Sequence, residues 1–152
     1  MKQMHSDLTN IDRTDVAELL ARYLIGLDAD PLDDDWAGGL FTADAVVEFP
    51  MSAHRGLAGM AGYHRDALGN FAATQHLGSP PAVQVAGDRA GLRANLTSTH
   101  VHHATRDGGP PEFFRTGTLV DGDAVRTDAG WRLTRLSFRV QWMDGRPPAG
   151  SS

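Results

Sequence analysis

Three side chains in the sequence could transfer protons: the carboxylate of Asp28 and the imidazoles of His76 and His100. Asp28 follows Leu24 by four residues, which places its carboxylate at the buried edge of a helix, close to the end of that helix. A carboxylate that is removed from water needs a partner, and such carboxylates are common in acid/base catalysis. The alternative is that Asp28 caps a loop or faces water beside Asp30.

His100 lies in the long run 90–105, whose alternation predicts a strand. One face of this run carries Leu92, Ala94, Leu96, Ser98, His100 and His102, and the other face is more polar. Because alternate side chains of a strand point in opposite directions, the first face should line the interior, with His100 in its wall. A neutral imidazole held there could act as a base near neutral pH. The alternative is a solvated strand end rich in histidine.

The elements that must position these residues begin with helices. A helix is expected from residue 11, with Asp12 as its N-cap and a buried stripe at spacings of three and four. The stripe consists of Val16, Leu19, Leu20, Tyr23, Leu24 and Leu27. A short helix near Trp36, a strand at 45–49 and a weaker helical pattern at 56–68 follow.

From residue 72 onward the apolar period is two, which predicts strands at 72–77, 82–86, 90–105, 112–120 and 131–143. Clusters of Gly, Pro, Asp and Ser separate these runs, as in turns between antiparallel strands. Helices first and strands afterwards predict an α+β domain over residues 11–143, with the helices packed in a strongly curved, mostly antiparallel sheet. A flexible leader, 1–10, and a flexible tail, 144–152, are expected at the ends.

The composition is that of one globular domain of 152 residues, large enough to hold a pocket. No run approaches the roughly 18 apolar residues that span a bilayer, and the first ten residues lack the apolar segment of a signal peptide, so we expect a cytoplasmic protein without membrane contact. The absence of cysteine excludes disulfides, thiolate nucleophiles and zinc sites that use sulfur. A net charge of −5 with scattered basic residues argues against nucleic acid as a partner.

Four short stretches resemble a known family. They are YLIGLD at 23–28, LFTADAVV at 40–47, TQH at 74–76 and GWRL at 130–133. Their order and spacing resemble the nuclear transport factor 2-like superfamily, in particular its SnoaL-like polyketide cyclase and scytalone dehydratase-like branch. The resemblance implies a cone-shaped α+β barrel, in which a bent sheet wraps around helices and leaves a mostly apolar cavity at its open end. Members include dehydratases, isomerases, cyclases, epoxide hydrolases and noncatalytic subunits, so the fold alone does not give the function.

The resemblance also implies roles for the three candidates. In the dehydratase-like relatives a strand histidine paired with the helix aspartate serves as the acid/base, and the matching position is His100. Asp28 would then orient His100, the principal base. The TQH stretch implies that His76 points into the pocket and donates to a substrate oxygen, although a histidine at the sheet edge would also fit. One carboxylate and two imidazoles can move protons between carbon and oxygen without a cofactor, so none is expected.

The chain departs from the dehydratase branch at two tyrosines that hold a water on the substrate carbonyl. Their places are taken here by Leu27 and, approximately, Phe49, while Tyr23 lies one turn earlier and could reach the pocket or belong to the core. Dehydration as in that branch is therefore less expected than general cyclisation or isomerisation. Arg115 and Asp121 resemble an Arg and an Asp common on the penultimate strand, but the Gly-Asp pair after Asp121 also fits a hairpin turn.

Flat apolar side chains are expected to wall the cavity for a polycyclic or prenyl-like substrate, or else to belong to the core. They are Trp36, Phe49, Met60, Tyr63, Phe71, Phe138 and Trp142. In the last run, Phe138, Val140 and Trp142 share one face by parity, and long polar side chains occupy the other. That outer face suits packing against a second copy, and the family resemblance implies a homodimer.

Two alternatives remain open. The segment from His100 to His103 is dense in imidazole and could hold a metal through His100 and His102, although no third ligand is indicated. A noncatalytic small-molecule carrier or oxygenase-assembly module would have an apolar pocket without paired titratable groups, and Asp28, His76 and His100 argue against it. The sequence predicts a cofactor-independent lyase, isomerase or cyclase that acts in biosynthesis on a hydrophobic, oxygenated, polyketide-like molecule.

Overall fold

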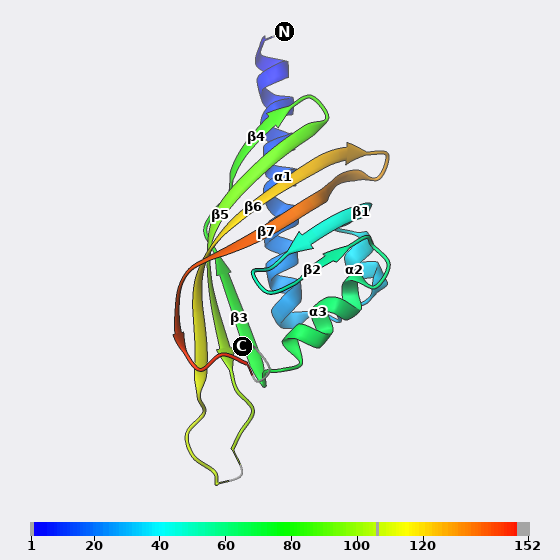
Figure 1. Cartoon of the computed structure of the whole chain (residues 1–152). Helices are drawn as coiled ribbons and strands as arrows, with labels where there is room; N and C mark the ends of the chain where they lie inside the picture. Colours follow the sequence, from blue (N-terminus) through cyan, green and yellow to red (C-terminus); the bar gives the residue numbers. More distant parts are fainter. Residues whose placement is uncertain (1, 106, 149–152) are drawn as a thin grey trace.

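A computed structural model describes residues 2–105 and 107–148. Its elements are α1 (Lys2–Ala29), α2 (Asp34–Gly38), β1 (Phe41–Glu48), β2 (Ala53–Arg55), α3 (Met60–Leu68), β3 (Ala73–Gly78), β4 (Ala82–Ala86), β5 (Arg89–Val101), β6 (Phe113–Thr127) and β7 (Gly130–Gly145). Figure 1 shows α1 running along one face of a strongly bent sheet, with α2 and α3 beside the lower part of that helix. This arrangement confirms the expected α+β class.

The sheet has seven strands in the order β2-β1-β7-β6-β5-β3, and β4 also pairs with β5. β1 runs parallel to β7, whereas the other pairs are antiparallel. β3 and β4 share one edge of β5, where β4 pairs with 89–93 and β3 with 96–101. Register shifts between β6 and β7 at 117/118 and 123/124 mark bulges, and bulges bend the strands that carry them. The sheet stays open rather than closing into a barrel.

The core forms where the apolar stripe of α1 meets the concave face of the sheet. Leu19, Leu20 and Tyr23 of α1 are almost fully buried, as are Leu133 and Leu136 of β7. The expected stripe is therefore confirmed, and it fixes the rotation of α1 about its own axis. With this rotation, Asp28 in the last turn of α1 faces the sheet.

The helix begins at Lys2, so the expected start at residue 11 is wrong, and residues 2–10 of the expected leader are helical. Residues 2–10 contain no glycine or proline to interrupt the helix. Asp12 is not an N-cap: its carboxylate accepts from Arg126 Nη2 at 2.7 Å and Trp131 Nε1 at 3.1 Å. In the described part of the chain, neither α1 nor another helix has the length and apolar character that a membrane span requires.

The expected tail, 144–152, overlaps the end of β7 at Gly145, and its residues 149–152 lie outside the described part, as does Met1 of the leader. The expected turn after residue 120 is also wrong, because β6 continues to Thr127. The Gly-Asp pair at 122–123 pairs with β5 on one side and β7 on the other, and this ladder overrides its local turn preference.

Candidate active site

A cavity of about 290 Å³ lies between α1, α3 and the concave face of the sheet. Most of its walls are apolar and include Leu27 of α1, Phe49, Phe71, and Phe114 and Phe138 of the sheet. Imidazoles, hydroxyls and one amide supply the polar groups. A largely apolar hollow with a few converging polar groups is typical of a small-molecule site.

Asp28 and His76 form a hydrogen-bonded pair at the edge of this cavity. Asp28 Oδ1 accepts from His76 Nδ1 at 2.7 Å and from Thr74 Oγ1 at 2.9 Å, and Oδ2 accepts from the His76 backbone N–H at 2.7 Å. Only 18% of the Asp28 side chain and 8% of the His76 side chain are exposed. Because an ionised carboxylate only accepts, the proton of neutral His76 lies on Nδ1, and Nε2 carries the lone pair.

The expected pairing of Asp28 with His100 is wrong. α1 packs against β3, and β3 lies at the sheet edge beside β5, with Thr74 opposite His100 and His76 opposite Ser98. β3 is the strand next to the end of α1, so the carboxylate of Asp28 bonds to the two inward-facing polar side chains of β3, Thr74 and His76. His100 lies one strand further into the sheet.

His100 nevertheless lies in the cavity wall, as its parity on β5 predicts. Its Nδ1 donates to Phe114 O at 2.9 Å, and its ring is edge-on to the His76 ring, with centroids 5.9 Å apart. Burial lowers the pKa of His100, and the Phe114 carbonyl opposes this effect only in part. His100 is therefore neutral at pH 7, with its lone pair on Nε2. Among the described residues, no hydrogen-bond partner occupies Nε2 of either His76 or His100.

A second buried pair, Tyr23 and His64, also lines the cavity. Tyr23 was a candidate from the sequence, whereas His64 was missed. His64 Nδ1 donates to Met60 O at 2.8 Å, and Tyr23 OH donates to His64 Nε2 at 2.8 Å. Burial lowers the pKa of His64 to about 4 and raises the pKa of Tyr23. The available signal was spacing, because His64 follows Met60 by four residues and precedes Leu68 by four on the inward stripe of α3.

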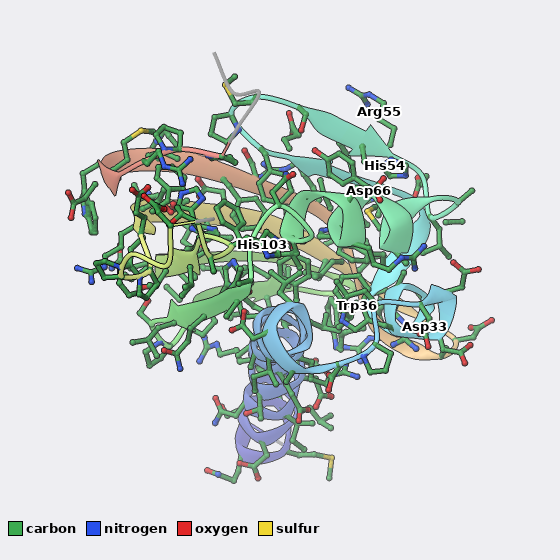
Figure 2. The ribbon with its side chains drawn as sticks, turned by 90° about the horizontal axis from the view of Figure 1, so that it is seen from below. Asp33, Trp36, His54, Arg55, Asp66 and His103 are labelled. Atoms are coloured by element: carbon green, nitrogen blue, oxygen red, sulfur yellow. The ribbon has the colours of Figure 1, made fainter. Side chains whose placement is uncertain are left out.

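The other residues expected at the cavity fall into two groups. Tyr63, Phe49 and Phe138 line it, and the rings of Phe49 and Phe138 stack at 4.6 Å. Met60 is fully buried behind the wall, and Trp36 of α2 stacks on Tyr23 at 5.8 Å. Figure 2 shows Trp36 beside the end of α1. Met60 and Trp36 belong to the core that supports the cavity rather than to its surface.

Three expected ligand contacts lie outside the cavity: Arg115, Asp121 and Trp142. Arg115 is exposed, and Asp121 forms an ion pair with Arg93. Trp142 is half exposed and pairs with Gly117, whereas Val140 pairs with residue 118, which makes 141 the extra residue of a bulge. This bulge reverses the parity of β7, so Trp142 leaves the face that carries Phe138.

Within residues 2–105 and 107–148, no group of three or more His, Asp or Glu side chains could hold a metal ion. His102 Nε2 lies 2.6 Å from Arg146 O, and His103 Nε2 lies 3.2 Å from Gly69 O at the end of α3 (Figure 2). The imidazoles of His100, His102 and His103 therefore do not converge on one point, and of these three only His100 lines the cavity.

Comparisons with known proteins agree with this architecture. The SnoaL-like domain model matches residues 9–137. An uncharacterised protein from Mycobacterium tuberculosis is 30% identical over 131 residues, which is 82% of each chain. A crystal structure of a protein from Kribbella flavida has 26% identity and a TM-score of 0.81, covering 90% of this chain and 95% of that one.

Two more distant structures share the fold. A nuclear transport factor 2-like superfamily protein from Salmonella enterica has a TM-score of 0.74 at 21% identity, covering 95% of this chain and 99% of that one. A protein from Novosphingobium aromaticivorans, provisionally named a scytalone dehydratase, has a TM-score of 0.76 at 19% identity, covering 97% and 99%. This chain belongs to the SnoaL-like domain family.

Proposed function

We propose that the protein is a cofactor-independent acid/base enzyme of the lyase or isomerase class, acting as a cyclase, dehydratase or isomerase on a hydrophobic, oxygenated small molecule. The observation that carries the proposal is the 2.7 Å bond from His76 Nδ1 to Asp28 Oδ1 at the edge of an apolar cavity. This bond leaves His76 Nε2 as a base with a fixed orientation. Two further hydrogen bonds, from Thr74 and from the His76 backbone, fix the orientation of the Asp28 carboxylate relative to the His76 ring.

His76 Nε2 would remove a proton from a carbon next to a carbonyl group, and the carboxylate of Asp28 would stabilise the imidazolium that forms. The C–H bond breaks, its electron pair moves into the enolate, and the proton stays on Nε2. The same imidazolium then returns the proton to another carbon in an isomerisation or to a departing oxygen in a dehydration. His100, neutral and with Nε2 unprotonated, would accept a hydrogen bond from a substrate hydroxyl.

The surroundings of the cavity support a biosynthetic, polyketide-like substrate class. Phe49, Phe138 and Phe71 offer flat apolar surface, and the fold is shared with a protein provisionally named a scytalone dehydratase. We further propose that the enzyme works in the cytoplasm as a homodimer, with the second copy on the outer face of the sheet, where Trp142 is 50% exposed.

The test uses 2-indanone, a neutral two-ring ketone with acidic α-protons, in D2O. Proton NMR follows exchange at the α-carbons with and without protein. Catalysed exchange is expected from the parent, with a loss of about 10²- to 10⁴-fold in His76→Ala. Asp28→Asn should lose a comparable factor, because an amide no longer stabilises the imidazolium.

His103→Ala is the matched control, because it removes an imidazole that lies outside the cavity. Exchange rates of His76→Ala and Asp28→Asn within threefold of the parent would contradict the proposal. Tight binding of 2-indanone by the parent without any catalysed exchange would instead favour the carrier module.

A further inference from the structure

Three hydroxyl groups line the floor of the cavity. Ser98, Thr116 and Thr118 are only 4%, 8% and 7% exposed, and all three line the cavity. In the described part of the chain none of the three hydroxyls has a hydrogen-bond partner. We call these three residues the hydroxyl row.

The hydroxyl row differs from the other polar groups of the cavity wall. Ser52 Oγ and Tyr63 OH bond to each other, and Asn70 Nδ2 donates to Ala67 O at 3.2 Å. Trp36 Nε1 is the one described side-chain polar atom that is both enclosed by protein and unpartnered. The hydroxyls of the row are therefore open to the cavity, where a ligand can reach them. Almost buried polar groups are normally hydrogen-bonded to protein or water, so three adjacent hydroxyls that face the cavity can exchange water for the oxygens of a ligand.

The row extends directly from the proposed base. His76 of β3 lies opposite Ser98 of β5, and Ser98 lies opposite Thr116 of β6. Neighbouring strands are about 4.8 Å apart, so Thr116 lies about 10 Å across the sheet from His76. Thr118 follows on the same face of β6. A flat molecule that lies on this floor would have one end at the imidazole and the other at the threonines.

The charge of the wall restricts this molecule further. No Lys, Arg, Asp or Glu is found among the described residues that line the cavity. A carboxylate or phosphate would enter without a cation to compensate for its lost hydration, which is costly. A hydroxyl group both donates and accepts, so the row suits ketone, ester and hydroxyl oxygens. At about 290 Å³ the cavity lies at the small end of ligand pockets, a size that suits one or two rings.

We propose that the hydroxyl row is the specificity site of the cavity, and that it selects uncharged, flat, one- or two-ring molecules that carry oxygens at both ends. A hydroxyl group at one end donates to Nε2 of His76 or His100, and the oxygen at the other end is bound by Ser98, Thr116 and Thr118. The proposal rests on the proposed function for the location of the reacting end. The row itself binds and positions the substrate and takes no proton.

The test measures binding alone, by calorimetry, with three inert probes at a pH that keeps the phenol protonated. Coumarin has its two oxygens at one end, 7-hydroxycoumarin adds an oxygen at the other, and 7-hydroxycoumarin-3-carboxylate adds a negative charge. The parent should bind 7-hydroxycoumarin about three- to tenfold more tightly than coumarin, because the phenol can donate one additional hydrogen bond to Nε2 of His76 or His100. The carboxylate should bind more weakly than 7-hydroxycoumarin.

In the double variant Thr116→Val, Thr118→Val both coumarin and 7-hydroxycoumarin should bind about three- to tenfold more weakly than in the parent, because their lactone oxygens lose the donors of the hydroxyl row. Thr97→Val is the control, because Thr97 lies on the outer face of β5, and its affinities should match those of the parent. No measurable binding of either probe by the parent would overturn the proposal, as would equal affinities of the parent and the double variant. Weaker binding in the double variant, together with no catalysed 2-indanone exchange by the parent, would reject the proposed function and keep this inference.

Discussion

Acidification should destabilise the protein through His64, the buried imidazole of α3. In the folded state His64 is neutral, and burial lowers its pKa from 6.5 to about 4. Between these two values the unfolded chain binds a proton that the folded chain does not, so the free energy of unfolding falls as the pH falls. The stabilisation that comes from the lowered pKa of His64 is complete above pH 6.5 and is lost as the pH drops toward 4. At 1.36 kcal/mol per pKa unit, the loss is about 3 kcal/mol, a large share of typical domain stability of about 5–15 kcal/mol.

Urea unfolding between pH 7 and pH 4.5 measures this loss, with His64→Gln as the variant that cannot titrate. The variant should be less stable at pH 7, because the bonds to Tyr23 and Met60 O are weakened. Its stability should then fall by about 2–3 kcal/mol less than that of the parent over the same pH range. His103→Gln, an exposed imidazole, should follow the parent. If the free energy of unfolding fell equally with pH in the parent and in His64→Gln, His64 would not be the cause of the loss.

Three further substitutions test other parts of the account. Gly26→Ala places a Cβ against the indole of Trp36 and should cost about 1–3 kcal/mol in urea unfolding; an unchanged midpoint would contradict this packing. Thr74→Val removes one of the bonds to Asp28 and should slow 2-indanone exchange about three- to tenfold with little change in stability, whereas an unchanged rate would show that Thr74 does not position the carboxylate. Trp142→Glu puts a charge on the proposed dimer face and should convert a dimeric mass to a monomeric one in light scattering; a dimer that survives would place the interface elsewhere.

The sequence specifies the elements of this fold well because most of its signals are local. The stripe of α1 and the alternation of β5 repeat over many residues, so both predicted the buried faces, including the inward direction of His100. The same alternation predicted that Trp142 points inward, which is wrong because a single extra residue at the β7 bulge reverses the alternation. Bulges depend on how two distant strands pair, and the strand itself does not reveal them.

The sequence predicted that Asp28, His76 and His100 lie near one another, but not how they pair. His76 and His100 line the cavity and Asp28 bonds to His76, because which imidazole receives the carboxylate depends on which strand lies next to α1. That neighbour is β3, at the sheet edge, a fact of sheet order that no local pattern contains. His64 was not predicted because a histidine on a weak helical pattern is more often exposed. Its spacing of four residues from Met60 nevertheless places it on the buried face of α3.

The position of the proton on the His76 ring shows whether Asp28 holds this imidazole as a base. Two-bond ¹H–¹⁵N correlation spectra at a pH where the imidazole is neutral distinguish a proton on Nδ1 from a proton on Nε2. The account predicts that His76 carries its proton on Nδ1, with a strongly downfield-shifted signal that is lost in Asp28→Asn. A proton on Nε2, or a His76 spectrum unchanged by Asp28→Asn, would contradict it.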